Sequence, residues 1–214
     1  MHAWKLEPHV NHIVMWLRFI DDMFLIGDGT DVEFEDNFEI LKKNDICLDF
    51  TYEISDKEIV FLDTRIYIAE GIIQTTLHRK ETATNAILHA ESHHPENLVW
   101  SIPYGEFLRI KRNCSEENEF KRHSNETRER LVKRKYPGKI LDKCYSRALT
   151  KSRNDALQRA ERKTENEKIR LITDYNVEAR NLKKILLKNW NILKLDPTLK
   201  DIIGSEPSIT YRKT

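Results

Sequence analysis

Residues 13–26 read IVMWLRFIDDMFLI, and this stretch decides the fold expected for the first part of the chain. Two short apolar and aromatic runs, typical of strands, are interrupted by Asp21-Asp22. The pattern predicts a β-hairpin with the two acids at its tip. Tight hairpin turns favour Asn-Gly or other glycine-containing pairs, and adjacent carboxylates repel each other. Because the acids break this local rule, we expect them to have a functional role.

The residues after the hairpin predict a helix and further strands. Glycines in segment 27–29 end the hairpin, and Thr30 with Glu33 forms a capping-box pattern that starts a helix running to about Lys43. Strand-like runs follow at 46–54, 59–68 and 72–78, with turns at 55–57 and 70–71 between them. The first part is therefore expected to be a small antiparallel sheet with one helix, an α+β arrangement.

The pattern changes after the Pro-Tyr-Gly sequence at 103–105, where strand signals give way to charged helical segments. These helices are expected at about 106–113, 116–135, 138–170 and 178–194, with an extended piece at 170–175 and a last turn at 196–197. An apolar stripe made of Ile140, Leu141, Cys144 and Ala148 indicates that the third helix packs on one face. We place a domain boundary near residue 101, between segments 1–100 and 101–214.

The charge of the chain changes sign at the same place. Residues 1–100 hold 8 basic against 19 acidic residues, a net charge of −11, and residues 101–214 hold 28 against 16, a net charge of +12. A basic half suits a polyanionic partner such as nucleic acid, although a solvated helix surface has the same composition. The candidate phosphate contacts in this half are Arg109, Lys111, Arg112, Arg128 and Lys133.

Several classes of protein are disfavoured by composition. No apolar run approaches the roughly 18 residues needed to span a bilayer, and the first ten residues lack the apolar core of a signal peptide. Cys47, Cys114 and Cys144 form no CxxC pair, so we expect reduced thiols in an intracellular compartment. Histidines at 89, 93 and 94 have no cysteine pair to complete a zinc site, and no zinc is expected. The tryptophans at 16, 100 and 190 are interpreted as core residues.

A pair of carboxylates held between apolar strands is suited to binding a divalent cation. Mg²⁺ prefers hard oxygen ligands and is typically held by one or two carboxylates together with substrate phosphates. Two such ions about 3.5–4 Å apart can stabilise the attacking and leaving oxygens of a nucleotidyl transfer. Asp21 and Asp22 are therefore the candidate metal ligands.

The hairpin sequence resembles a known catalytic motif. Residues 16–24, WLRFIDDMF, look like the C motif of reverse transcriptases, in which an aromatic-x-Asp-Asp sequence occupies a hairpin of the palm domain. The segment from Leu48 to Lys57 resembles the D motif, and Phe61-Leu62-Asp63 stands where those enzymes carry the primer-grip motif. Segments 77–82, 92–95, 102–105, 175–176 and 190–193 are similar to Penelope-like retroelements, so the likeness covers roughly 13–212.

The resemblance implies different roles for the two parts of the chain. Residues 1–100 would be part of a palm with the C, D and E motifs, and residues 101–214 a helical thumb or helix-turn-helix-like region that grips a primer–template duplex. Asp21 would bind Mg²⁺ with Asp22 as its partner, and Lys57 would donate a proton to pyrophosphate, unless it is an ordinary turn lysine. The residues Phe61, Leu62 and Asp63 would form the primer grip. A nuclear location is expected for such a protein.

The chain departs from the family pattern at its start. The first metal-binding aspartate, the fingers and the template-binding B motif lie N-terminal to this hairpin in the family, whereas only twelve residues precede Ile13. We therefore expect the C-terminal portion of an RNA-directed DNA polymerase that is inactive without its N-terminal half. Two alternatives stay open: a non-enzymatic helix-turn-helix-like protein that binds nucleic acid, and a protein–protein scaffold.

Overall fold

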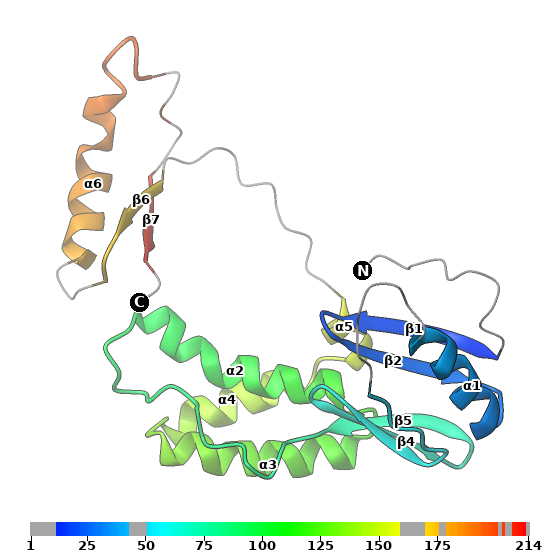
Figure 1. Cartoon of the computed structure of the whole chain (residues 1–214). Helices are drawn as coiled ribbons and strands as arrows, with labels where there is room; N and C mark the ends of the chain where they lie inside the picture. Colours follow the sequence, from blue (N-terminus) through cyan, green and yellow to red (C-terminus); the bar gives the residue numbers. More distant parts are fainter. Residues whose placement is uncertain are drawn as a thin grey trace. The chain divides into compact units, whose positions relative to one another are not determined.

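The computed structural model describes residues 12–42, 51–158, 170–175, 179–200, 203 and 207–212. The fold is α+β, as predicted, and its elements are shown in Figure 1. The chain forms two compact units, the first made of residues 1–84 and 109–125 and the second of residues 85–108 and 126–214. The predicted boundary near residue 101 falls within the helix α2 (Glu96–Asn113). The assignment of 1–100 to a palm and 101–214 to a thumb stays a prediction.

The predicted hairpin is confirmed in the first unit. Strands β1 (Ile13–Phe19) and β2 (Asp22–Gly27) pair antiparallel, with Phe19 opposite Asp22. The turn consists of Ile20 and Asp21, so its position is shifted by one residue from the predicted Asp21-Asp22 tip. Ile20 adopts a left-handed conformation with φ of 54°, and the Arg18 Nε donates a hydrogen bond of 2.8 Å to its carbonyl oxygen. The arginine thus holds a turn that lacks glycine.

Helix α1 (Asp31–Lys42) begins at the predicted capping box. The backbone N–H of Thr30 donates to Glu33 Oε2 at 2.7 Å, and the Glu33 N–H donates to the Thr30 hydroxyl at 3.4 Å. These bonds to Thr30 hold the pKa of the Glu33 carboxyl below its ordinary value. The reciprocal pair satisfies two of the free amide donors at the helix start.

A three-stranded antiparallel sheet follows, made of β3 (Glu58–Phe61), β4 (Thr64–Ala69) and β5 (Ile72–Leu77). The single strand predicted at 59–68 is wrong, because the chain reverses at Leu62-Asp63, where Leu62 has a φ of 57°. Alternation alone did not reveal this turn, since it contains no glycine. The strand predicted at 46–54 lies outside the described residues up to 50, and residues 51–54 are not in a strand.

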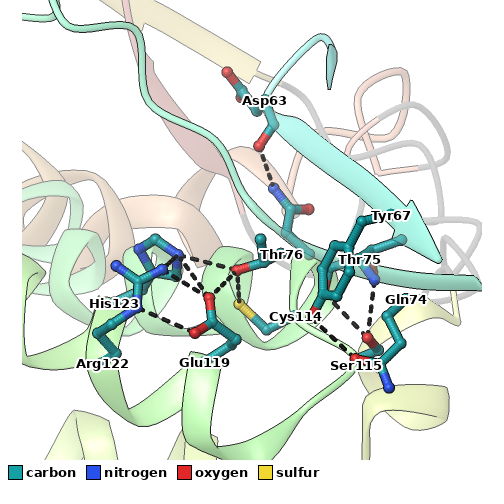
Figure 2. A network of polar contacts seen from close by, with 11 residues as sticks. Asp63, Tyr67, Gln74, Thr75, Thr76, Cys114, Ser115, Glu119, Arg122 and His123 are labelled. Atoms are coloured by element: carbon teal, nitrogen blue, oxygen red, sulfur yellow. Dashed lines mark hydrogen bonds and ion pairs between the residues drawn. The ribbon is translucent and has the colours of Figure 1, made fainter. Parts of the chain in front are cut away.

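A network of polar contacts connects β5 to the start of α3 (Glu117–Lys133) in the first unit (Figure 2). The Thr76 hydroxyl donates to Glu119 Oε2 at 2.7 Å and lies 3.1 Å from His123 Nε2. The neighbouring Thr75 exchanges backbone bonds with Ser115, whose N–H donates to the Thr75 carbonyl at 2.8 Å and whose hydroxyl accepts the Thr75 N–H at 2.9 Å. The buried hydroxyl of Thr76 and the backbone of Thr75 therefore have partners on the segment that leads into α3.

Glu119 is the ionised centre of this network. Hydrogen bonds from Arg122 and then from Thr76 lower the pKa of the Glu119 carboxyl to about 2, against an ordinary value of 4.5. A lowered folded-state pKa contributes stability that is complete above about pH 4.5 and is lost as the pH falls towards 2.

We therefore predict that Glu119→Gln flattens the acid dependence of stability. Between pH 7 and pH 3 the unmodified chain should lose about 1–2 kcal/mol more unfolding free energy than the variant, as urea titrations would measure. Glu129→Gln, a change at an exposed position of the same helix, is the control and should behave like the unmodified chain. Identical acid dependence of all three proteins would contradict this role of Glu119.

Three helices build the core of the second unit. The side chains of Val99 and Phe107 on α2, Leu131 on α3, and Leu141 and Ala148 on α4 (Gly138–Leu149) are buried. The break predicted at 103–105 is wrong, because α2 continues through Pro103. An interior proline removes one helical hydrogen bond and costs about 3 kcal/mol, and the full burial of the Pro103 ring offsets part of that cost.

The helix predicted over 138–170 is also shorter than expected. Helix α4 ends at Leu149, and a short helix α5 (Arg153–Leu157) begins after Ser152, whose hydroxyl accepts the Asp155 N–H at 3.0 Å. This N-cap restarts the chain in a new direction. Residues 159–169 lie outside the described part. The apolar stripe is confirmed, with Leu141 and Ala148 fully buried.

The last part of the second unit contains β6 (Arg170–Thr173), α6 (Ala179–Leu193) and β7 (Ser208–Tyr211). Strands β6 and β7 pair in parallel, and β7 was not predicted. Trp190 is buried, which confirms the core interpretation, whereas Trp100 is 39% exposed, so that interpretation is wrong for Trp100. Among the described helices, none is long and apolar enough to cross a membrane.

Candidate nucleic-acid interface

Helices α3 and α4 form a helix-turn-helix arrangement. Residues 134–137 join them, a four-residue connection of the length found in such motifs. The N–H groups of Arg134 and Tyr136 both donate to the Leu131 carbonyl, at 3.0 and 3.2 Å, and Lys135 takes a left-handed φ of 63°. Pro137 then precedes the first residue of α4 with an extended ψ of 135°. The turn is thus defined by backbone bonds and by a proline at the N-cap of α4.

The segment before α2 is bonded to this turn and to the end of α3. The Ala90 N–H donates to the Arg134 carbonyl at 2.9 Å, and the Asn85 Nδ2 donates to the Arg130 carbonyl at 3.0 Å. Lys135 pairs with Glu91 at 2.9 Å, which lowers the pKa of the Glu91 carboxyl. These bonds fix the extended segment along the end of α3 and hold the turn in one conformation.

The solvent face of α4 carries a row of cations, which we call the α4 basic stripe: Lys139, Lys143 and Arg147. They are spaced four residues apart, so they lie on one face of the helix, opposite the buried Leu141 and Ala148. All three are exposed. Within the described part of the chain Lys139 and Lys143 have no ion pair, and the Arg147 guanidinium lies 4.2 Å from the centre of the Tyr104 ring.

The predicted phosphate contacts have different surroundings from those of the stripe. Arg109 pairs with Asp63 at 2.5 Å, Arg128 pairs with Asp142, and the Lys111 ammonium lies 4.8 Å from the centre of the Phe120 ring. Arg112 and Lys133 are exposed. Arg109, Lys111 and Arg128 are therefore engaged within their own unit. A phosphate would have to compete with those partners.

The α4 basic stripe was missed in the sequence, although the signal was present there. Lys139, Lys143 and Arg147 recur every fourth residue, out of phase with the apolar residues of the same helix. The predicted contacts were instead placed on α2, at Arg109, Lys111 and Arg112, and on α3, at Arg128 and Lys133. The informative quantity is the position of the cations around the helix relative to the apolar stripe. Cations that all lie opposite the apolar stripe form a continuous charged face, whereas cations next to acidic residues form scattered ion pairs.

The structure also places the predicted catalytic residues. Asp21 and Asp22 are both exposed at the β1–β2 tip, and Lys57 is exposed in the bend before β3. Asp63 lies in the β3–β4 turn, where Arg109 anchors it. The Phe24 and Phe61 rings, 5.4 Å apart between centroids, pack one hairpin against the other. In the described ranges, no group of three His, Cys, Asp or Glu side chains is arranged to hold a metal ion.

Residues 86–146 match the family described as the animal helix-turn-helix domain. The match covers less than a third of the chain and contains α2, α3 and most of α4. This part of the chain is thus similar to a helix-turn-helix domain. No curated protein and no solved structure matches the chain.

Proposed function

We propose that the chain binds nucleic acid through the helix-turn-helix segment, with α4 as the helix that faces the ligand. The observation that carries this proposal is the α4 basic stripe, in which Lys139 and Lys143 are exposed and without an ion pair in the described residues. It lies on α4, which is the second helix of the α3–turn–α4 arrangement and the third helix of the matched segment 86–146. In such motifs the second helix approaches the duplex while the first crosses the backbone.

Phosphate contacts dominate this mode of binding. Lysine and arginine side chains neutralise phosphates and release counterions, which supplies affinity without reading sequence. The exposed face of α4 offers flexible lysines and an arginine held on a tyrosine ring. Such a face is suited to gripping a duplex backbone rather than to discriminating between base pairs.

We predict that the whole chain binds duplexes of unrelated sequence with similar affinity. Fluorescence anisotropy with two labelled duplexes of about 20 base pairs, at about 50 mM salt, measures this. Affinities within a few-fold of each other are expected, because both duplexes present the same phosphates. The absence of binding to either duplex would contradict the proposed function.

A second candidate function is that the chain forms part of a reverse transcriptase, in which the helical unit holds a primer–template duplex. The observation that favours it is the β1–β2 hairpin, which presents Asp21 and Asp22 at an exposed tip on two apolar strands. The adjacent β3–β4 turn carries Phe61-Leu62-Asp63 and packs through Phe61 on Phe24 of β2. This is the arrangement expected for the C and primer-grip motifs.

The donor set at the tip fits Mg²⁺. Two exposed carboxylates provide hard oxygen ligands, and substrate phosphates would complete the coordination. When bound, Mg²⁺ would neutralise charge that develops on the transferred phosphoryl group. Asp21 and Asp22 would hold the ion, and the exposed Lys57 would act as a proton donor in the proposed reaction. Nucleic-acid binding by the helical segment is common to both candidate functions.

A further inference from the structure

A small pocket lies beside the helix-turn-helix turn, within the second unit. It encloses about 210 Å³ and is formed by the loop before α2, the first turns of α2 and the residue Tyr175. The loop is held to the α3–α4 turn by the Ala90–Arg134 backbone bond and the Glu91–Lys135 ion pair. Six of its lining residues matter here: Glu91, Ser92, His93, His94, Trp100 and Tyr175.

Aromatic rings form much of the wall. The His93 and Tyr175 rings are 5.4 Å apart between centroids, and Tyr175 makes an edge contact with Tyr211 at 5.1 Å. Trp100, another lining residue, makes an edge contact with Tyr136 at 6.1 Å between centroids, while 39% of its surface stays exposed. The rings are thus held in place by other rings, and one large indole surface is still available to a ligand.

Two polar atoms of the lining residues have no hydrogen-bond partner among the described residues. They are Ser92 Oγ and His94 Nδ1, which are shielded from solvent. The hydroxyl of Tyr136, whose ring contacts the Trp100 ring, is also buried without a partner in the described part of the chain. Buried polar atoms in proteins nearly always have a hydrogen-bond partner, and leaving one unpaired costs about 1–3 kcal/mol. Two such atoms, on Ser92 and His94, belong to residues that line one pocket, and we infer that a polar ligand completes the site.

We propose, on the basis of the proposed nucleic-acid binding, that this pocket takes a single unpaired nucleobase from the end of a strand. A base offers a flat face to Trp100 and Tyr175 and a hydrogen-bonding edge to Ser92 and His94. The volume is below the roughly 300–1,000 Å³ of sites for drug-sized ligands, which suits one planar ring system. The carboxylates of Glu91 and Glu96 at the rim would repel a phosphate and accept hydrogen bonds from exocyclic amino groups.

The position of the pocket fits a strand that leaves a duplex. The loop that lines it contacts the turn preceding α4, so the pocket lies beside the N-terminal end of the helix that carries the α4 basic stripe. Stacking of a base on aromatic side chains is tolerant of sequence, which agrees with a backbone-gripping helix. The pocket would therefore recognise the junction between paired and unpaired nucleic acid.

Four labelled duplexes with the same paired sequence test the proposal with the whole chain. The first is blunt. The second and third carry a single-nucleotide overhang, one on each strand. The fourth carries an abasic overhang with the same phosphate but no base. Anisotropy should show the base-containing overhang binding about 5- to 50-fold more tightly than the blunt duplex on one strand polarity. The abasic duplex should bind like the blunt one.

Two substitutions test whether the pocket residues cause the tighter binding of the overhang duplex. Trp100→Leu keeps apolar volume without the stacking surface, and Tyr175→Ala removes the opposite ring. Each should abolish the overhang gain and leave blunt-duplex affinity unchanged, whereas Tyr52→Ala, an exposed aromatic residue of the other unit, should retain the gain. Circular dichroism confirms that each variant is folded.

The outcomes separate this inference from the proposed function. If the blunt duplex binds but no overhang improves affinity, the pocket proposal fails and the proposed function stands. The base does not enter this pocket if the abasic overhang raises affinity as much as the base-containing overhang does. The same conclusion follows if the Trp100→Leu variant still binds the overhang duplex more tightly than the blunt duplex. If no duplex binds at all, the proposed function fails, and the inference fails with it.

Discussion

Reversing the α4 basic stripe should weaken duplex binding by about 10²–10³-fold at about 0.1 M salt, because three phosphate contacts and their released counterions are lost. The variant carries Lys139→Glu, Lys143→Glu and Arg147→Glu. The stripe is exposed, and Lys139 and Lys143 have no ion pair in the described residues. The substitutions should therefore leave the fold intact. Anisotropy with a labelled duplex measures the change.

A matched control separates a local contact from the overall charge. Lys183→Glu, Lys184→Glu and Lys188→Glu change the net charge by the same amount on α6, where all three lysines are exposed. This control should lose much less affinity than the stripe variant. Equal losses would mean that binding depends only on net charge and would remove α4 from the interface.

The second large effect concerns Asp21 and the reverse transcriptase proposal. In a polymerase assembled from this chain and a family-type N-terminal half, Asp21→Asn should slow primer extension by at least about 10³-fold. Asparagine keeps the shape of the side chain and removes the charge that holds Mg²⁺. Extension of an oligo(dT) primer on poly(rA) measures the rate.

Asp28→Asn serves as the control for this experiment. Asp28 is an exposed acid just after β2, near the open end of the same hairpin, where it contacts His12 at 3.3 Å. The control should keep the rate within a few-fold of the unmodified polymerase. A rate for Asp21→Asn within tenfold of the unmodified enzyme would remove Asp21 from the metal site.

Short sequence patterns were sufficient to predict those elements whose ends are determined by nearby side chains. The capping box at Thr30 and Glu33 was predicted and found, and the hairpin within residues 13–26 was found with its turn one residue earlier than the predicted Asp21-Asp22 tip. Their determinants lie within a few residues, so short patterns contain them. The α+β class followed from the change of periodicity along the chain.

The errors have a common physical cause, which is that tertiary contacts override local propensity. Pro103 reads as a helix break, but its ring is fully buried, so packing favours a continuous α2. Leu62-Asp63 turns without glycine, and Arg109, far away in sequence, anchors Asp63 there. The parallel strands β6 and β7 pair although they are more than 30 residues apart in the sequence, and a local sequence pattern does not predict such a contact.

The candidate site was predictable in part for the same reasons. A basic helical half was evident from charge, but the pairing of Arg109 with Asp63 and of Arg128 with Asp142 depends on tertiary contacts. The pocket at the turn combines the segment 90–100 with Tyr175, and the distance in sequence hides it. Trp100 looked like a core residue because composition does not report on exposure.

The salt dependence of duplex affinity shows whether the chain binds nucleic acid through phosphate contacts. The whole chain is the right reagent, because a cut near residue 101 would sever α2. With four to six phosphates neutralised, a plot of log affinity against log salt should have a slope of about −4 to −5 between about 50 and 200 mM. The stripe variant should reduce the magnitude of that slope by about 3. A slope near zero, or one unchanged by reversing the stripe, would contradict the account.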